Sequence, residues 1–414
     1  MDRHPWMQAG LGHVWLPYSQ MKTMRPPLPV VRTHGCRIVL ADGRELIDGI
    51  ASWWTACHGY NHPYIAAAVE KQLVDMPHVM FGGLVHEQPL WLAQRLASLL
   101  PGDLERAFFS ESGSVAVEIA LKMALQYWIN RGEPKRKKFI AFEDGYHGDT
   151  TGAMAVSDPD AGMHDAFRGA LPEHIIATMP LDETIVTRHS DELAGIIVEP
   201  LVQGAGGMKF NDAATLQALR RICDKHNLLL IFDEIFTGFG RAGTMFACEQ
   251  AGVVPDIITL SKALTGGTLP LAATVARKHV FDAFWSDDPQ KALMHGPTYM
   301  GNALASAAAN ASLDLFEREP RLQQVKAIGE QMARELSPCR DMAGVKNVRI
   351  KGGIGVVELD RIADLGALRA RFLEEGVFIR PFGNVVYLTP SFTISSDELS
   401  TLTRAIVKVV SEGT

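Results

Sequence analysis

The sequence predicts an α/β protein with a large domain around a mainly parallel sheet and a smaller α+β domain. From about residue 60 to residue 300, helical periodicity alternates with short runs that are apolar throughout, as in strands covered on both faces. The 414 residues exceed one domain of roughly 150 residues. Hydrophobic residues make up 47% and charged residues 21%, a globular balance that excludes a disordered or fibrous chain.

Charge and cysteine usage exclude several functional classes. The formal net charge of -7 argues against nucleic acid as a partner. The five cysteines are scattered without a Cys-x-x-Cys pair, and the fourteen histidines form no pair at zinc spacing, so neither a disulfide framework nor a metal site is expected. No apolar run approaches the roughly 20 residues of a membrane span, and the first residues do not resemble a secretory signal. We therefore expect a soluble, cytoplasmic protein without a membrane partner.

Residues 1–60 are predicted to form an arm and a hairpin that complete the small domain. The proline-rich stretch at 25–29 favours extended backbone. Asp42-Gly43 separates the apolar runs Arg37–Leu40 and Leu46–Asp48, which is a strong hairpin signal.

Residues 61–300 are predicted to form the large domain. Apolar residues recur with helical spacing over Ser114–Asn130, and a second helix is expected over Ala213–His226. The strand-like runs are Phe139–Phe142, Ile196–Val198, Leu228–Phe232, Ile257–Leu260 and Leu271–Val275.

Residues 301–414 are predicted to form the smaller C-terminal domain. Helices are expected over 302–317, 322–336, 365–375 and 397–410, with strands over 353–359 and 385–388.

Ionisable residues follow several of the predicted strands. Glu199 follows one strand, Asp233-Glu234 follows the next, and Ser261-Lys262 follows a third; Asp144, Tyr146 and His147 follow the run Phe139–Phe142. Because ligands of open α/β sheets bind outside the carboxyl ends of the strands, these residues are predicted to line one cleft.

A lysine and an aspartate at neighbouring strand ends suit pyridoxal phosphate (PLP). A desolvated lysine loses its charge readily and can attack an aldehyde, and a buried aspartate can hydrogen-bond a pyridinium nitrogen. Lys262 and Asp233 are the candidates.

Two small-residue segments are candidates for the phosphate. Ser110–Ser114 precedes the helix from Ser114, whose first amides and positive dipole end favour an anion, but from this motif alone an ordinary N-cap by Ser112 or Ser114 is the better interpretation. His295-Gly296-Pro297-Thr298 is predicted to begin another helix and to offer a hydroxyl and further amides.

The segment Gly238–Gly243 matches the dinucleotide pattern Gly-x-Gly-x-x-Gly. It does not directly follow its strand, and no clear amphipathic helix opens at Gly243, so a glycine-rich loop carrying Arg241 is the better interpretation.

These residues resemble the signature of the class III PLP-dependent aminotransferases, and the resemblance extends over nearly the whole chain. The segments that carry it are Phe232–Ile235, Thr237–Arg241 and Ser261–Gly267, together with Trp15–Tyr18, Ser52–Trp54, His58–Pro63, His78–Gly83, Tyr146–Thr150, His295–Thr298 and Ile379–Gly383. The resemblance implies the fold of the fold type I PLP enzymes. Within the class it is closest to the members that transfer an amino group from S-adenosylmethionine to 8-amino-7-oxononanoate in biotin biosynthesis.

The resemblance also implies a role for each matched residue. Lys262 would bind PLP covalently and move the proton, Asp233 would pair with the pyridine nitrogen, and Tyr146 would stack on the ring. The phosphate would be held by Gly113 and Ser114, with Pro297 and Thr298 reaching it from the partner subunit of a homodimer. The substrate would contact Tyr18, Trp53, Tyr146, Lys262, Gly296 and Arg380.

We therefore expect a ping-pong transaminase. Phe236 and Ser261 depart from the family pattern and would alter the shape of the pocket, so the amino donor is not fixed by the resemblance. The alternatives in the same class are an ω-amino acid or ornithine-type aminotransferase and an enzyme that uses lysine as donor. A nicotinamide-dependent dehydrogenase built on Gly238–Gly243 is the alternative from another class, and a non-catalytic scaffold comes third.

Overall fold

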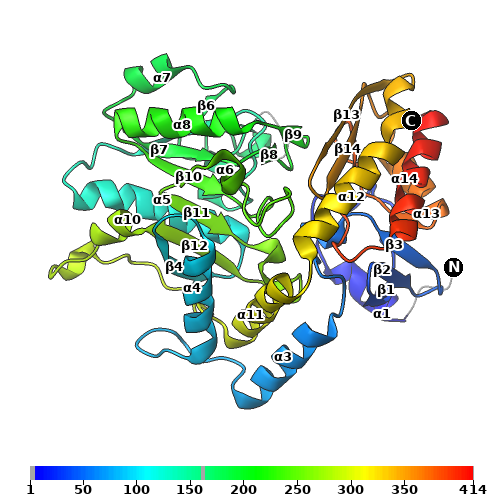
Figure 1. The fold of residues 1–414 in the computed structure, drawn as a ribbon, viewed down its shortest axis with the longest axis horizontal. Coiled ribbons are helices and arrows are strands. Elements are labelled where there is room, and N and C mark those ends of the chain that lie inside the picture. Colours follow the sequence, from blue (N-terminus) through cyan, green and yellow to red (C-terminus); the bar gives the residue numbers. More distant parts are fainter. Residues whose placement is uncertain (1–4, 160–163, 414) are drawn as a thin grey trace.

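The computed structural model describes residues 5–159 and 164–413 (Figure 1). Its largest sheet has seven strands in the order β4-β12-β11-β10-β7-β5-β6. The strands are β4 (Leu104–Ser110), β5 (Lys138–Phe142), β6 (Ile175–Ala177), β7 (Leu193–Val198), β10 (Leu229–Asp233), β11 (Ile257–Leu260) and β12 (Ala272–Arg277). All neighbours from β11 to β6 are parallel, and β12 is antiparallel to both β4 and β11, so the predicted mainly parallel sheet is confirmed.

The sequence patterns missed β4 and β6, which are the two edge strands. β6 has only three residues, and β4 carries the exposed charged residues Glu105 and Arg106. Short or charged strands are typical of sheet edges because they discourage pairing with another chain. A search for continuous apolar runs therefore finds the central strands and passes over the edges.

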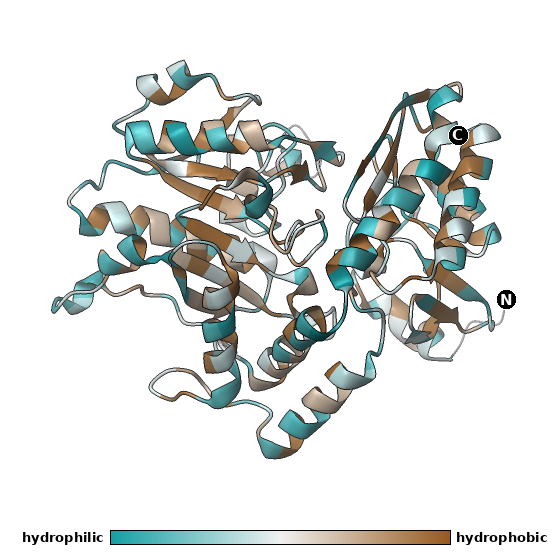
Figure 2. Ribbon diagram, viewed as in Figure 1, coloured by the Kyte–Doolittle hydropathy of each residue, from teal (hydrophilic) through white to brown (hydrophobic). Residues whose placement is uncertain are grey.

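Side chains of the central strands alternate between two hydrophobic layers. In β10, Leu230 and Phe232 pack on one face, and Leu229 and Ile231 pack on the other. The first layer includes residues of α8 (Ala213–His226) and the second includes residues of α5 (Gly113–Asn130), so these predicted helices cover opposite faces. Figure 2 shows the strands as largely hydrophobic ribbon among helices of mixed hydropathy.

Further elements of this part are mostly helices. They are α3 (Pro63–Asp75), α4 (Glu87–Leu99), α6 (Thr151–Ala155), α7 (Glu183–Arg188), α9 (Cys248–Ala251), α10 (Lys278–Asp282) and α11 (Ala303–Arg318), with the short pair β8 (Val202–Gln203) and β9 (Lys209–Phe210). The N-terminal arm begins with α1 (Pro5–Gly10), which was not predicted.

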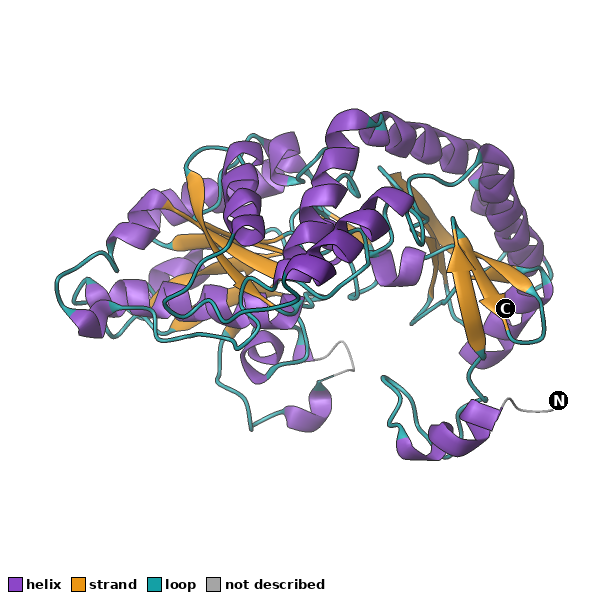
Figure 3. Ribbon diagram, turned by 90° about the horizontal axis from the view of Figure 1, so that it is seen from below, coloured by secondary structure: helices purple, strands orange, loops and turns teal. Residues whose placement is uncertain are grey.

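The smaller part combines both ends of the chain. Its elements are β1 (Val30–His34), β2 (Arg37–Leu40), β3 (Glu45–Asp48), α12 (Arg321–Glu335), β13 (Val345–Lys351), β14 (Ile354–Leu359), α13 (Leu365–Glu374), β15 (Val377–Phe378), β16 (Val385–Leu388) and α14 (Ser396–Ser411). The predicted hairpin is present as β2 and β3, and β3 pairs in parallel with β15. Figure 3 shows these strands apart from the large sheet.

We propose the same three-part division of the chain with one boundary moved. Cys36 and Ile47 share a core with Met332 and Leu402, which supports placing residues 1–60 with the C-terminal domain. Helix α11, however, packs against α3 and α4, and the second boundary therefore fits better after Arg318 than at residue 300 (Figure 1).

The helix predicted over 302–317 is confirmed as α11, which begins at Ala303, but the segment His295–Thr298 opens no helix of its own. Gly301 adopts a φ of +64°, which a right-handed helix does not allow, and the side chain of Asn302 accepts a hydrogen bond from the amide of Ala305 at 3.0 Å. A left-handed glycine followed by an asparagine N-cap sets the helix start here.

Two further observations bear on chemistry. All five cysteines are free and buried. Across the two described ranges, no helix combines the length and the apolar character needed to cross a bilayer.

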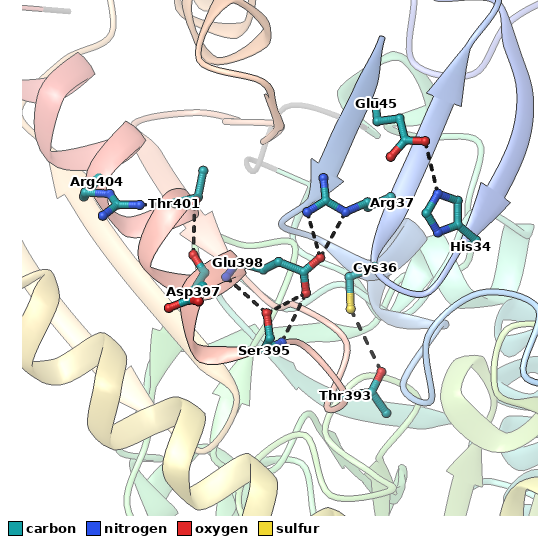
Figure 4. A network of polar contacts seen from close by, with 10 residues as sticks. All are labelled: His34, Cys36, Arg37, Glu45, Thr393, Ser395, Asp397, Glu398, Thr401 and Arg404. Carbon is teal, nitrogen blue, oxygen red and sulfur yellow. Dashed lines mark hydrogen bonds and ion pairs between the residues drawn. The ribbon is translucent and has the colours of Figure 1, made fainter. Parts of the chain in front are cut away.

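A polar network joins the N-terminal hairpin to the start of α14 (Figure 4). The guanidinium of Arg37 contacts Glu398 Oε1 at 3.1 Å. Ser395 Oγ accepts the amide of Glu398 at 3.3 Å, while the other oxygen of Glu398 accepts the amide of Ser395 at 3.2 Å. This reciprocal capping box satisfies helix donors that would otherwise lack partners.

Replacing Ser395 by Ala will lower the free energy of unfolding by about 1 kcal/mol because the capping hydrogen bond is lost. Equilibrium urea unfolding measures the change. Ser396→Ala is the matched control, since Ser396 is an exposed neighbour that is not the N-cap. Equal losses in the two variants would contradict the assignment of the cap.

Candidate active site

Four parallel strands end around one cavity of about 550 Å³. Its lining includes Tyr146 and His147 after β5, Glu199 after β7, Asp233 at the end of β10, and Lys262 after β11. Gly113 and Ser114 at the start of α5 line the same cavity. The fold thus brings together these residues, which are far apart in the sequence.

Asp233 is buried, and both of its carboxylate oxygens are engaged. Oδ2 lies 2.7 Å from His147 Nδ1, and Oδ1 accepts hydrogen bonds from the Thr259 hydroxyl and the Ile235 amide, each at 3.1 Å. These contacts fix the orientation of the carboxylate. The sequence predicted His147 for the cleft, but its contact with Asp233 appears only in the folded chain.

Glu199 supports the loop that carries Tyr146. It accepts the amide of Tyr146 at 3.0 Å and the amide of Gly204 at 2.9 Å. Burial raises the pKa of Glu199 to about 7, and the charge of Asp233 acts in the same direction against the opposing effect of His147.

Two acidic residues predicted for the cleft lie outside it. Glu234 turns away from Asp233 because successive strand residues point to opposite faces, and it accepts the amides of Ala247 and Cys248 at 2.7 and 2.8 Å. Asp144, at a left-handed turn, forms an ion pair with Lys209.

The amine of Lys262 lies against an aromatic wall. Its Nζ is 4.4 Å from the ring centroid of Trp54 and 5.9 Å from that of Phe236. Burial lowers the pKa of Lys262 to about 8, although the negative charges of Asp233 and Glu199 oppose this change. A large neutral fraction near pH 8 makes this amine a competent nucleophile.

The tryptophan pair stands on a left-handed turn. Residues 51–54 all have positive φ angles between 46° and 74°, which are unfavourable for residues other than glycine. The buried carboxylate of Asp48 accepts two amide hydrogen bonds from this region and one from the Tyr60 hydroxyl. These contacts hold the turn, and the rings of Trp54 and Phe236 pack with centroids 4.2 Å apart.

A second cavity of about 970 Å³ adjoins the first. The two share Trp54, Tyr146, Ala205 and Lys262, and the second is completed by Tyr18, Trp53, Arg369, Arg380, Phe382 and Tyr387. Lys262 therefore stands where the two cavities meet.

The N-terminal arm contributes to the second cavity through Tyr18. Its hydroxyl lies 3.1 Å from the hydroxyl of Tyr146 and donates a hydrogen bond to Asp149. The Tyr18 ring meets Trp53 edge to face at 6.1 Å, and the guanidinium of Arg380 lies 5.3 Å from the centroid of Trp53. The cavity thus has aromatic walls and a cationic end.

The first cavity fits PLP. The opening amides of α5 have no partner within the helix and suit a phosphate. Glycine is needed beside them: a Cβ on Gly148 would lie 2.1 Å from Ser114 Oγ, and one on Gly113 would lie 2.9 Å from Ile235. Asp233 supplies an anion for a pyridinium nitrogen, and Lys262 supplies an amine for an aldehyde.

Gly296, Pro297 and Thr298 line neither cavity of their own chain, and Gly296 and Thr298 are exposed. This placement fits the expectation that they reach the site of a partner subunit, which stays a prediction.

The Gly238–Gly243 loop has a structural task. Arg241 is buried and donates hydrogen bonds to the carbonyls of Gly353 at 3.2 Å and Pro390 at 2.8 Å, above the ring of Phe392. The next helix, α9, begins only at Cys248 and has four residues. The dinucleotide alternative is therefore wrong, because its motif needs a helix N-terminus that this loop lacks.

Sequence reasoning missed Arg369 and assigned no role to Trp54. Arg369 belongs to no recognisable motif and reaches the cavity only through the packing of α13. Trp54 belongs to one of the segments that carry the family resemblance, but only the folded chain shows that it lines both cavities, whereas Trp53 lines the second alone.

Comparison with known proteins identifies the family. Residues 18–410 match the family described as Aminotransferase class-III. The chain is 43% identical to the adenosylmethionine-8-amino-7-oxononanoate aminotransferase of Buchnera aphidicola subsp. Acyrthosiphon pisum, covering 95% of each chain. It is 44% identical to the enzyme of the same name from Mycobacterium leprae, covering 96% of this chain and 94% of that one.

Solved structures are similar over nearly their full length. A crystal structure of adenosylmethionine-8-amino-7-oxononanoate aminotransferase from Methanocaldococcus jannaschii aligns with a TM-score of 0.93 and 31% identity, covering 98% of each chain. A PLP-bound amine transaminase from an uncultivated Pseudomonas species aligns with a TM-score of 0.89 and 32% identity, covering 97% of this chain and 99% of that one. By these matches over nearly its whole length, the chain belongs to the class III aminotransferases, fold type I enzymes that use PLP.

Proposed function

We propose that this enzyme moves an amino group from S-adenosylmethionine to 8-amino-7-oxononanoate and so forms 7,8-diaminononanoate for biotin biosynthesis. The main structural support is that the two cavities meet at the Lys262 amine. The names of full-length relatives supply the substrates. Because donor and acceptor would use one substrate cavity in turn, a ping-pong sequence follows.

The residues of the first cavity divide the work of holding PLP. Gly113 and Ser114 would bind the phosphate, Asp233 the pyridine nitrogen, and Tyr146 the ring face. Bound PLP supplies an electron sink for the carbon that carries the amine. Lys262 Nζ would hold the cofactor covalently until the substrate's amine displaces it, and the freed Lys262 amine would then accept the proton from that carbon.

His147 and Glu199 keep this arrangement in place. The hydrogen bond from His147 orients Asp233, and Glu199 fixes the backbone of Tyr146. Trp54 and Phe236 exclude water from the Lys262 amine, which keeps a neutral form accessible.

The second cavity suits both proposed substrates. Aromatic walls at Tyr18 and Trp53 accommodate a long alkyl chain and can also accept an adenine face or a sulfonium cation. The guanidinium of Arg380 matches a carboxylate through two parallel hydrogen bonds.

The working unit would be a homodimer in the cytoplasm. Thr298 and its neighbours lie outside their own chain's cavities, as residues donated to a second subunit would. Large apolar side chains are also exposed on the segments 74–91 and 294–299; they are Val74, Met80, Leu84, Val85, Leu90, Trp91, Met294 and Tyr299. Burial against a second copy would cover them.

Covalent attachment of PLP to the apoprotein will accelerate as pH rises through about 8 and will level off only above that value. Lys262 reacts as the neutral amine, and its pKa of about 8 sets the midpoint. Rapid mixing with detection of the visible absorption band measures the rate. Lys262→Ala will give no such band, whereas Lys278→Ala, which removes an exposed lysine of α10, will behave as wild type. A normal band in Lys262→Ala would contradict the assignment.

S-adenosylmethionine will discharge the visible band of the holoenzyme about 100-fold more efficiently than lysine or ornithine, a ratio within reach of pocket contacts. Single-turnover absorbance with each amine in turn measures this preference. A faster reaction with lysine or ornithine would assign the enzyme to another donor, and a colourless protein that binds NAD would refute the PLP assignment.

Arg380→Met will raise the KM for 8-amino-7-oxononanoate about 100-fold, because a charge-assisted hydrogen bond contributes roughly 1.5–3 kcal/mol. Steady-state kinetics with varied acceptor measures the effect, with the visible band as a check that PLP is bound. An unchanged KM would rule out the proposed carboxylate contact.

A further inference from the structure

The substrate cavity has an unbalanced charge. Its lining includes three cationic side chains, Lys262, Arg369 and Arg380, and no carboxylate. Neither Arg369 nor Arg380 forms an ion pair with any residue in the described ranges. By contrast, Arg371, two residues from Arg369 on the same helix, pairs with Glu412. Two unpaired guanidinium groups in an aromatic cavity need a physical explanation.

Arg369 is tied to the backbone that carries Arg380. Its Nη2 and Nε donate hydrogen bonds to the carbonyl of Pro381 at 2.7 and 3.3 Å. Pro381 directly follows Arg380. The planar fork of one arginine, anchored on α13, therefore restrains the loop that presents the other.

The two guanidinium groups also repel each other. Partial burial, with the charge of Arg380 acting in the same direction, lowers the pKa of Arg369. Like charges held in an apolar cavity raise the free energy of the empty site, and an entering anion relieves that repulsion. An uncharged ligand of the same shape would gain nothing from it.

We propose that Arg369 determines substrate specificity: it positions Arg380 through the Pro381 carbonyl and adds a second positive charge, so that the cavity selects chains ending in a carboxylate. The identity of the acid substrate, 8-amino-7-oxononanoate, rests on the proposed function. The preference for an anion rests on the geometry alone and can be tested without turnover.

Binding of nonanoate and nonanamide to the PLP-loaded enzyme, measured by calorimetry, tests the proposal. The two ligands share chain length and differ in charge. Wild type should bind nonanoate at least tenfold more tightly, since charge-assisted contacts exceed neutral ones. Arg369→Met should weaken nonanoate about tenfold and change nonanamide less than twofold, while Arg369→Lys, which keeps the charge without the fork, should recover part of the preference.

Arg371→Met is the matched control, because it removes the same side chain from the same helix outside the cavity, and it should leave both affinities unchanged. If Arg369→Met does not fold, as judged by the visible band and thermal unfolding, Arg369→Gln replaces it. Equal weakening of both ligands would show that Arg369 only supports the shape of the cavity, and unchanged affinities would show no role. Either result overturns the proposal.

Turnover separates this proposal from the proposed function. In Arg369→Met, the KM for 8-amino-7-oxononanoate should rise about tenfold while kcat stays within threefold, because the chemistry at Lys262 is untouched. A rise in KM without a change in kcat marks lost binding. If Arg369→Met loses the preference for nonanoate but wild type does not convert the named substrates, the proposed function fails and the inference about Arg369 stands. If wild type converts them and shows no preference for nonanoate, the inference fails alone.

Discussion

The proposed chemistry depends on one amine, Lys262 Nζ, which lies against aromatic rings where the two cavities meet. Lys262 follows a buried strand, adopts a left-handed backbone conformation, and presents Nζ to the faces of Trp54 and Phe236. Burial pulls its pKa down, while Asp233 and Glu199 limit the fall. Stronger desolvation would lower the proton affinity of the Lys262 amine further. Weaker desolvation would leave it as an unreactive ammonium group. A pKa near 8 would let this one group serve as nucleophile and as proton carrier, as the proposed function requires.

The two cavities are built by different parts of the chain. The parallel sheet supplies the cofactor cavity, since its strand ends converge and the start of α5 lies beside them. The substrate cavity is assembled from the arm at Tyr18, the turn at Trp53 and the C-terminal segment at Arg380. Movement of the smaller part relative to the sheet would therefore alter substrate contacts more than cofactor contacts. Arg241, buried between the two, limits such movement.

Backbone strain is concentrated in the turn at residues 51–54, which carries the two tryptophans of the cavities. Four consecutive non-glycine residues at 51–54 have positive φ angles, and Asp48 holds them with hydrogen bonds. On this turn Trp54 lines both cavities, while its neighbour Trp53 lines the second alone. Strained residues persist only where the surrounding contacts over-determine them.

The sequence by itself determined the order of elements, the mainly parallel sheet, the family and the lysine–aspartate pair. Apolar runs and the residues that follow them are contiguous in the sequence, and they stay contiguous in the folded chain, so they can be recognised without the tertiary structure. Only the tertiary structure decided that Glu234 faces away from Asp233, that His147 contacts Asp233, that Arg369 enters the substrate cavity, and that Gly238–Gly243 braces the smaller domain. Each of these contacts joins residues whose direction depends on strand pleat or on packing between distant elements, and sequence spacing carries no record of that direction.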